Sequence, residues 1–561
     1  MAETVGEQVV QVGERRVFLR HAGRGPAVVL LHQSPQSSAA MLPLMARLAQ
    51  RHAVFAPDTP GFGLSDPLPL AQPTIPDLAR ALGDLLQALG LQRVVLYGVH
   101  TGAVIAARLA HDRPGCVAGL LCDGLALFTA DERQPLLDGY LPPFEPSWDG
   151  THLLWLWARI REQYRYFPWH VHSAATRLRY PPMPVEKLHA DVMDVLAAGD
   201  GFRAGYRAPL LYADGAAVAA ALAVPAWLLY RDTDVLRPHL ARLSGLPTQV
   251  RAASVADDAA LAQSLCDFAA SHAQAAVDVD AERQVAQAAA CSRFVSSTAQ
   301  GRLGWHMRIG NGTADATLVL SIGDIGTPAQ WAMDAPAAAT AVAVDLPGHG
   351  ASSAWCAQGL TVAAIAVAIQ GTLNQHPDLA GRAVELRACG GSAALAVALA
   401  ARLGARCRSL RLHDPLPLDA EETARFLATL PTLQVQAGGE HLLAAWNWAR
   451  ERRLYWLWRP ADAGCAVPAA APPPLQVHTE VRQMLRAGPL WSALWRLCLH
   501  DGWQLALRSL DCPITLSSSP HDEPMRLCAK LTQEMVAGGG RAEPVTRNID
   551  RGTLIHFSTR T

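Results

Sequence analysis

The stretch Arg93-Val-Val-Leu-Tyr-Gly-Val-His-Thr-Gly102 joins an apolar run of strand length directly to Ala103–Ala110, which has helical character. Two similar apolar runs precede it, Ala27–Leu31 and Ala53–Ala56, and each ends in turn-forming residues. Strands that alternate with helices are typical of a mostly parallel sheet covered by helices on both faces. The expected fold class is therefore α/β.

The chain repeats its landmarks at a nearly constant offset. Asp58-Thr-Pro-Gly-Phe-Gly63 corresponds to Asp345-Leu-Pro-Gly-His-Gly350, which lies 287 residues later. His152 corresponds to His441, 289 residues later, and both stand in a Gly-x-His-Leu-Leu context. An offset that stays within a few residues over most of each half indicates a tandem duplication.

The duplication predicts two domains, 1–291 and 302–561, because 561 residues exceed one ordinary domain. The boundary is placed in Ser292–Gly301, which is polar and lacks periodicity. In each copy a long, partly helical and aromatic-rich stretch interrupts the strand–helix alternation, at about 128–208 and about 417–505. Such an insertion is expected to form a cap over the carboxyl ends of the strands.

Composition excludes several classes of function. The net charge is −1 and no basic run is present, so no nucleic-acid partner is expected. The longest apolar run, Gly215–Tyr230, contains Pro225 and is too short to span a membrane, so it is interpreted as a helix end, a turn and a strand. The opening MAETVGEQVV lacks signal-peptide features, and the eleven cysteines form no C-x-x-C pair. We expect a cytoplasmic protein with a small-molecule substrate, and the oligomeric state stays open.

In their order, these landmarks resemble the α/β-hydrolase superfamily over nearly the full length of both halves. His32-Gln-Ser-Pro35 stands where the family has its first loop, and Gly98–Gly102 stands at the nucleophile elbow. Val224-Pro225 leads to Asp234, at the place of the family's acid. The resemblance implies an oxyanion hole formed by the backbone N–H groups of Ser34 and Thr101.

The departures from the family pattern concern the catalytic residues. His100 occupies the elbow apex, where the family has Ser, Cys or Asp, and no G-x-S-x-G string occurs. The second copy has Gly390 at its apex. The first copy lacks a late histidine after Asp234, whereas the second has the candidate pair Asp522 and His556. Neither copy therefore supplies a Ser-His-Asp triad from matched positions.

A histidine at an elbow apex lies at a helix N-terminus, whose dipole is expected to lower the pKa of His100 and keep the imidazole neutral. A neutral imidazole beside an oxyanion hole favours a general base. The leading interpretation is a cofactor-independent enzyme without a metal. It would be a hydrolase of an ester, a lactone or a C–C bond, or a lyase or decarboxylase, acting on a small apolar or aromatic substrate.

Several candidates have two interpretations. His152 is a catalytic candidate or a structural histidine of the cap, and Asp234 orients a partner or caps the next helix. His32 contacts substrate or orders its own loop by a hydrogen bond. Trp157 is the cap residue proposed to contact substrate. The spacing of His32, His100 and His152 does not indicate a metal site.

Two rival hypotheses remain at this level. One is a non-catalytic binding or scaffold protein, which the apex Gly390 favours and the well-formed elbow Gly98–Gly102 opposes. The other is a site shared between the copies, in which His100 pairs with Asp522 and His556.

Overall fold

The computed structural model describes residues 5–273, 279–281, 293–311, 317–329, 335–455, 466, 470–519, 522–537, 541–544 and 554–558. The chain divides into two compact units. The first consists of Met1–Glu145 and Trp155–Cys291, and the second of Pro146–Leu154 and Ser292–Thr561. No helix in these ranges is long and apolar enough to cross a membrane.

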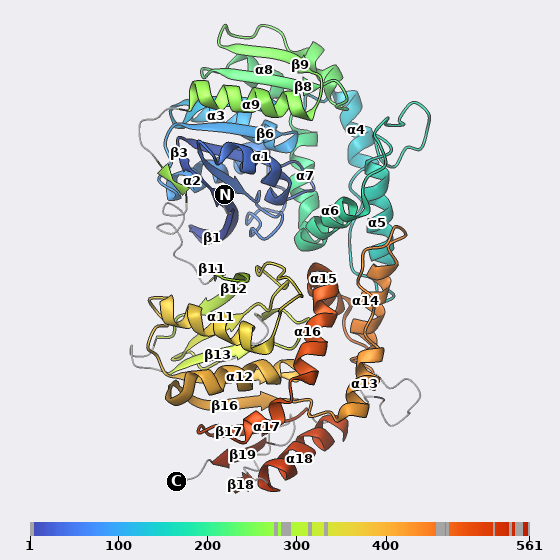
Figure 1. The fold of residues 1–561 in the computed structure, drawn as a ribbon. Coiled ribbons are helices and arrows are strands. Elements are labelled where there is room, and N and C mark those ends of the chain that lie inside the picture. Colours follow the sequence, from blue (N-terminus) through green and yellow to red (C-terminus); the bar gives the residue numbers. More distant parts are fainter. Residues whose placement is uncertain are drawn as a thin grey trace. The chain divides into compact units, whose positions relative to one another are not determined.

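The first unit is built on an eight-stranded sheet with the order β1-β2-β5-β4-β6-β7-β8-β9 (Figure 1). The strands from β5 to β9 run parallel, while β1 and β2 are antiparallel. The bounds are β1 Gly6–Val12, β2 Arg15–Ala22, β4 Ala27–Leu31, β5 Ala53–Pro57, β6 Val94–Val99, β7 Val117–Asp123, β8 Ala226–Arg231 and β9 Val250–Val255. A separate short pair joins β3 (Arg24–Gly25) to β10 (Val279–Asp280). The expected α/β class with a mostly parallel sheet is confirmed.

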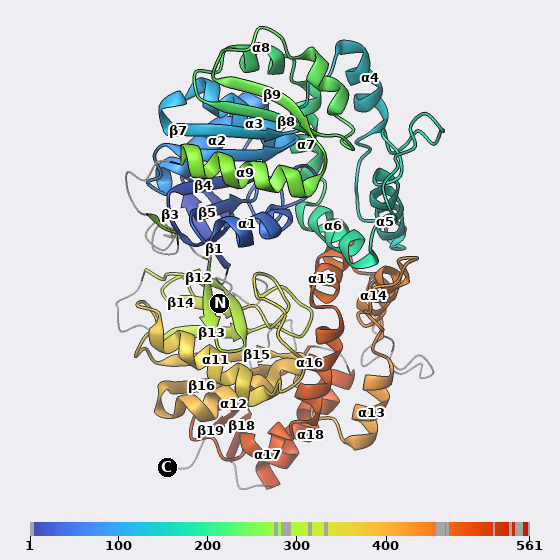
Figure 2. The same cartoon turned by 45° about the horizontal axis from the view of Figure 1, so that its top comes forward.

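Helices cover both faces of this sheet. Side chains of α2 (Ile75–Ala88), α3 (Thr101–Asp112) and α8 (Gly215–Ala220) join one buried apolar cluster, and those of α1 (Leu42–Leu48) and α9 (Asp258–His272) join another. The helices themselves are labelled beside the sheet in Figure 2. Local sequence explains α2, since Thr74 and Asp77 form a capping box at its start. Its apolar side chains then recur at helical spacing and are buried on the sheet.

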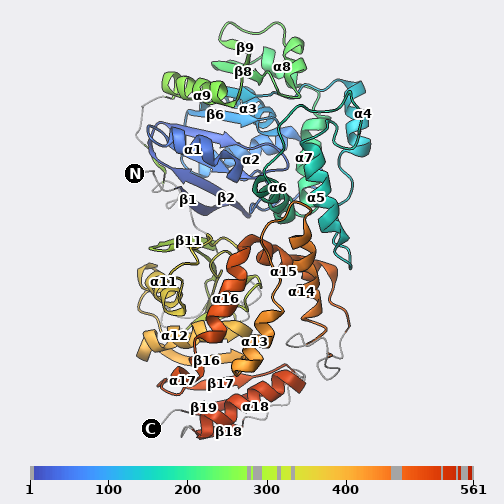
Figure 3. The same cartoon turned by 45° about the vertical axis from the view of Figure 1, so that its right-hand side comes forward.

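The second unit has a similar mixed sheet with the order β11-β12-β14-β13-β15-β16-β17-β19-β18. Figure 3 labels its strands β16 to β19 near α17 and α18. Its strands are β11 Arg293–Thr298, β12 Gly301–Arg308, β13 Leu318–Ile322, β14 Thr340–Val344, β15 Val384–Cys389, β16 Cys407–His413, β17 Ile514–Ser517, β18 Arg541–Pro544 and β19 Leu554–Ser558. Helices α11 (Val362–Gln375), α12 (Ala393–Leu403), α17 (Trp503–Leu507) and α18 (Asp522–Ala537) accompany this sheet.

The repeated Asp-x-Pro-Gly-x-Gly motif ends equivalent strands, as the sequence predicts. Asp58 follows β5 and Asp345 follows β14, each the third strand in its sheet order. Gly63 and Gly350 both have positive φ, and a Cβ on either would lie about 2 Å from a carboxylate oxygen of the motif's own aspartate. Only glycine fits so close to that carboxylate, which accounts for the glycine in both halves.

Each unit carries a helical insertion between its sixth and seventh sheet positions. In the first unit these helices are α4 Ala130–Gly139, α5 Thr151–Gln163, α6 Val185–Ala198 and α7 Gly201–Leu211. In the second they are α13 Ala420–Ala428, α14 Glu440–Glu451, α15 Pro474–Ala487 and α16 Pro489–His500. Both insertions lie where the sequence predicts caps.

Two sequence-based boundaries need correction. Ser292–Gly301 was expected to be a connecting segment, but Arg293–Thr298 forms β11 and pairs with β12. Its polar composition suits an edge strand, which is paired on one side only. Pro146–Leu154, expected in the first cap, packs with the second unit. Gly215–Tyr230 does contain a helix end, a turn and a strand, as expected.

Candidate active site

His100 lies at the sharp turn between β6 and α3. Its backbone has φ 44° and ψ −103°, a conformation that is strained for a residue with a Cβ. The turn closes tightly because both flanking glycines lack a side chain. A Cβ on Gly98 would lie 2.3 Å from the carbonyl carbon of Gly102, and one on Gly102 would lie 2.4 Å from the Leu31 oxygen. The Gly-x-His-x-Gly spacing is therefore a steric requirement of the elbow.

Asp234, which follows β8, binds the imidazole of His100. The distances from His100 Nε2 are 2.9 Å to Oδ2 and 3.2 Å to Oδ1 of Asp234. The Leu236 N–H donates to Asp234 Oδ1 at 2.8 Å and holds the carboxylate in place. Gly124 makes room for the pair, because a Cβ there would lie 2.6 Å from the His100 ring and 2.7 Å from Asp234 Oδ2.

A half-buried guanidinium supports this carboxylate. Arg231 Nη2 lies 3.5 Å from Asp234 Oδ2, and the same side chain contacts Asp123 at 3.2 Å and Asp258 at 2.9 Å. Burial alone would raise the pKa of Asp234, but His100, the Leu236 N–H and Arg231 outweigh it and lower that pKa to about 2. Asp234 is therefore ionised at neutral pH.

The expectation of a lowered pKa for His100 is wrong. Burial does favour the neutral imidazole, but the Asp234 carboxylate outweighs burial and raises the pKa of His100 above its ordinary value. With Nε2 engaged by Asp234, the proton of the neutral ring is held on Nε2. His100 Nδ1 makes no hydrogen bond to a described residue, so Nδ1 is the nitrogen left for chemistry.

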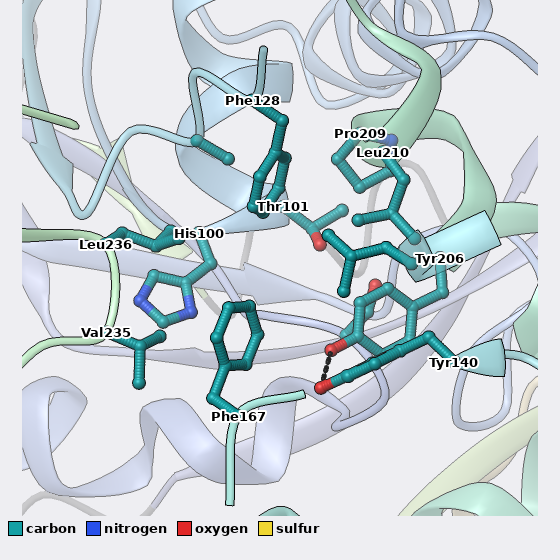
Figure 4. A pocket seen from close by; sticks show the side chains of 13 residues that line it. His100, Thr101, Phe128, Tyr140, Phe167, Tyr206, Pro209, Leu210, Val235 and Leu236 are labelled. Atoms are coloured by element: carbon teal, nitrogen blue, oxygen red, sulfur yellow. Dashed lines mark hydrogen bonds between the residues drawn. The ribbon is translucent and has the colours of Figure 1, made fainter. Parts of the chain in front are cut away.

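The His100 side chain, 26% exposed, lines a cavity that measures about 450 Å³ when the open solvent at its mouth is included (Figure 4). Its polar lining comes from Ser34, His100, Thr101, Tyr140 and Tyr206. Its apolar lining comes from Ala126, Phe128, Leu136, Phe167, Pro209, Leu210, Val235 and Leu236. An apolar cavity with a few polar groups at defined points is the usual form of a small-molecule site.

Ser34 and Thr101, whose N–H groups the resemblance implies as oxyanion donors, line this cavity. The backbone N–H groups of the two residues donate no hydrogen bond within the described ranges. The Ser34 hydroxyl is buried and likewise has no partner there. Buried polar groups are normally satisfied, so these groups are available to a bound molecule.

His32 does not line the cavity. Its Nε2 accepts a hydrogen bond from the Thr59 N–H at 2.9 Å, and its Nδ1 lies 3.0 Å from the Gln33 carbonyl oxygen. Burial lowers the pKa of His32, which favours the neutral ring that these contacts need. The loop-ordering interpretation of His32 fits this geometry, and contact with substrate does not.

His152 and Trp157 also lie away from the cavity lining. His152 belongs to the second unit, where its Nδ1 faces the Ser147 hydroxyl at 3.1 Å and its Nε2 faces His478 Nδ1 at 3.1 Å. Burial lowers the pKa of His152 to about 4. Trp157 is fully buried in the first unit. Neither side chain lines the cavity, so this geometry fits the structural interpretation of His152, and the substrate contact of Trp157 stays a prediction.

Sequence reasoning missed the cavity residues that come from the cap. Tyr140, Phe128 and Tyr206 face the cavity, but no spacing pattern distinguishes them from the other aromatic residues of that stretch. The contact of Arg231 with Asp234 had a detectable signal, because the two residues are three apart at the end of a strand.

The second unit has a different elbow. Gly390, its apex, has φ 58°, and a Cβ there would lie 2.4 Å from Asp324 Oδ1. The Gly391 N–H donates to Asp324 Oδ1 at 2.9 Å. Arg452 Nη1 contacts Asp324 Oδ2 at 3.0 Å, and Arg452 Nε contacts the fully buried Glu480 at 2.7 Å. The N–H group that follows the apex therefore already donates to a carboxylate of the protein.

The side chains of Asp522 and His556 lie outside the described residues, so that candidate pair stays a prediction. Within the described part of the chain, no three His, Cys, Asp or Glu residues cluster as metal ligands would.

Comparison with known proteins gives partial matches. Residues 26–161 match the family described as alpha/beta hydrolase fold. An uncharacterised protein of Mycobacterium tuberculosis is 38% identical over 109 residues, which is 19% of this chain and 31% of that protein. An uncharacterised hydrolase of Saccharomyces cerevisiae is 31% identical over 135 residues, which is 24% of this chain and 45% of that protein. Haloalkane dehalogenase 2 of Mycobacterium tuberculosis is 30% identical over 116 residues, which is 21% of this chain and 41% of that protein.

The chain spans less than half the length of each of these curated relatives. The matched range begins just before β4 and contains the elbow, so the resemblance drawn from the sequence holds at the level of fold. Residues 26–161 have the α/β-hydrolase fold.

Proposed function

We propose that the first unit is an enzyme in which His100, oriented by Asp234, acts as a general base on a small molecule held in the cavity. The observation that carries the proposal is the 2.9 Å contact between His100 Nε2 and Asp234 Oδ2 at a strained elbow. A buried carboxylate that fixes a histidine tautomer is the arrangement that prepares an imidazole for proton transfer. Relatives named as a hydrolase and a dehalogenase are consistent with hydrolysis.

The proposed reaction is hydrolysis of an ester, a lactone or a C–C bond, without a cofactor. His100 Nδ1 takes a proton from a water molecule, and the resulting hydroxide attacks the substrate carbonyl carbon. The carbonyl oxygen becomes an oxyanion, which the N–H groups of Ser34 and Thr101 would stabilise. Collapse expels the leaving group, which takes the proton back from Nδ1. Removal of a substrate proton by the same base would support a lyase or decarboxylase.

Two alternatives for the nucleophile fit the site less well. An acyl-imidazole on His100 would need a second base to activate water, and no other histidine is among the described residues that line the cavity. Ser34 lines the cavity, but its hydroxyl makes no hydrogen bond to His100 or to any other described group. A serine without a base is a poor nucleophile.

We further propose that the chain is a tandem duplication whose second unit is a degenerate copy with a binding or structural role. Three changes support this: Gly390 replaces the apex side chain, Asp324 occupies the neighbouring N–H group, and Arg452 neutralises that carboxylate. An anionic intermediate would be repelled by Asp324. The non-catalytic alternative therefore applies better to the second unit than to the first.

Replacement of His100 by Ala or Gln tests the proposal. A panel of aryl esters, lactones and β-keto acids first identifies a turned-over substrate. Each replacement should then lower kcat by roughly 10²–10⁴-fold in a protein that still folds, although it loses the stabilising contact with Asp234. A fluorophosphonate probe should label no serine stoichiometrically. Turnover that survives both replacements, or stoichiometric serine labelling, would remove His100 from the mechanism.

A further inference from the structure

The cavity that His100 lines carries a second polar point in the cap. Tyr140 directly follows α4 and Tyr206 lies in α7, and both line the cavity. Their hydroxyl oxygens are 3.3 Å apart, and Figure 4 shows the two groups meeting on the side away from His100. One hydroxyl must donate to the other, so one hydroxyl hydrogen of the pair remains without an acceptor among the described residues. A bound molecule with an acceptor group would satisfy it.

A buried cation packs against the Tyr140 ring. The Arg159 side chain comes from α5 and the residue is only 1% exposed. Its guanidinium carbon lies 5.9 Å from the ring centre of Tyr140, 5.3 Å from that of Trp169 and 5.5 Å from that of Phe202. Arg159 Nη1 donates to Gln163 at 3.3 Å, whereas Nε and Nη2 are buried without a partner in the described part of the chain.

Arg20, the other arginine that is buried among the described residues, and the half-buried Arg452 both have carboxylate partners. Arg20 contacts Glu7 at 3.1 Å, and Arg452 contacts Asp324 and Glu480. Arg159 has only aromatic rings and one amide around it within the described ranges. A guanidinium stays charged in proteins, and a buried charge without a counter-ion is strongly disfavoured. The positive potential behind Tyr140 is therefore uncompensated until an anion arrives.

We propose that the molecule bound in this cavity carries a carboxylate, which the Tyr140–Tyr206 hydroxyls hold and Arg159 neutralises from behind. The inference rests on the proposed function in one respect only, which is that the reacting carbonyl group of the bound molecule lies beside His100. Phe128, Phe167 and Leu210 form apolar walls of the same cavity. The substrate class is thus an acid with an apolar or aromatic body and a reactive carbonyl group away from its carboxylate.

Binding tests the carboxylate site without any turnover. The probes are 4-phenylbutyrate and its neutral amide, 4-phenylbutanamide, measured by calorimetry on the full chain. The parent protein should bind the acid roughly 10–100-fold more tightly, as expected for charge-assisted hydrogen bonds to a buried site. Tyr140→Phe keeps the ring, removes the hydroxyl and should reduce the preference to a few-fold, as should Arg159→Gln.

The His100→Gln variant separates this site from the elbow. It should keep the preference for the acid, because the proposed carboxylate site does not include His100. Equal binding of the two probes by the parent protein overturns the inference, as does a preference lost only in His100→Gln. If Arg159→Gln fails to fold, Tyr140→Phe decides, and an unchanged preference in that variant overturns the inference.

Turnover then distinguishes the two proposals. The substrates are the phenyl half-ester of glutaric acid and its methyl-capped diester. The free acid should have a kcat/KM roughly 10-fold or more above that of the diester, and Tyr140→Phe should reduce this ratio. Equal turnover of both esters overturns the carboxylate site and leaves the role of His100 standing. Selective binding of 4-phenylbutyrate without turnover of either ester supports the carboxylate site and counts against ester hydrolysis.

Discussion

Replacement of Asp234 by asparagine removes one charge from the centre of the site and keeps the shape of the side chain. The Asp234 side chain is 1% exposed. Although burial raises the pKa of Asp234, its partners lower it from 3.8 to about 2. A difference of nearly two pKa units corresponds to about 2 kcal/mol of folding free energy. Because the pKa is lowered on folding, this contribution is present above pH 4 and is lost as the pH falls through about 2. Asp234→Asn should therefore lower the free energy of unfolding in urea by about 2 kcal/mol at pH 7.

The same replacement should change how His100 titrates. In the parent protein the Asp234 carboxylate raises the pKa of His100 against the effect of burial. Without the carboxylate, burial remains and the pKa of His100 should fall below its ordinary value near 6.5. In the parent protein the charged His100–Asp234 pair stabilises the fold fully between about pH 4 and pH 6.5, and this contribution is lost as the pH rises through the raised pKa of His100. The variant should lack that loss, and its kcat should fall by roughly 10²–10⁴-fold because the imidazole is no longer oriented.

Carbethoxylation measures the titration of His100 without a substrate, because diethyl pyrocarbonate modifies only the neutral imidazole. Mass mapping of the peptide that contains His100, over pH 5 to 8.5, should give a midpoint above 6.5 in the parent protein. The midpoint should lie below 6.5 in Asp234→Asn. His172, whose side chain is 56% exposed, is the internal control and should react alike in both proteins. The same midpoint for His100 in both proteins, or a parent midpoint below 6.5, would refute the electrostatic account.

Two further predictions concern the elbows. Gly98→Ala should lower the free energy of unfolding, measured by thermal melting, by about 3 kcal/mol or more, because the new Cβ would meet backbone atoms at 2.3 Å. Gly115→Ala is the control and should cost little, because its Cβ would have nothing within 4 Å. Asp324→Ala should cost about 1–3 kcal/mol in urea because Arg452 and the Gly391 N–H lose an acceptor, and Asp324→Asn, which keeps an oxygen there, should cost less. Equal stability of either matched pair would contradict the corresponding contact.

The fold was predictable because its signals are local. The apolar runs at Ala27–Leu31 and Val94–Val99, their turn residues and the repeated Asp-x-Pro-Gly-x-Gly motif each fix backbone conformation over a few residues. His100 could be identified from the same kind of signal, since two glycines at fixed spacing define the elbow. Asp234 could be proposed as the acid because the Val224-Pro225 pair that precedes it resembles the pattern of the α/β-hydrolase superfamily.

What the sequence did not reveal depends on contacts between distant segments. The pKa of His100 was predicted in the wrong direction because the helix N-terminus is adjacent in sequence, whereas the Asp234 carboxylate is 134 residues away. The sequence assigns His152 to the wrong unit because the first residues of α5 belong to the second unit, whereas the rest of the helix belongs to the first. Tyr140, Tyr206 and Arg159 gave no signal, since their placement follows from the path of the cap and not from a spacing pattern.

The two elbows resolve the same backbone strain in opposite ways. Gly390 adopts φ 58° without a steric penalty, and the space at its apex is filled by Asp324. His100 adopts φ 44° with a Cβ, a conformation that costs on the order of 1–3 kcal/mol at a non-glycine residue. Glycine at position 100 would relieve that strain, as Gly390 does in the second unit. A strained histidine beside a buried carboxylate is therefore better explained by its chemistry than by stability. In the His100→Gly variant, relief of the backbone strain should raise the free energy of unfolding, and loss of the Asp234 contact should offset part of that gain. The variant should also lose turnover.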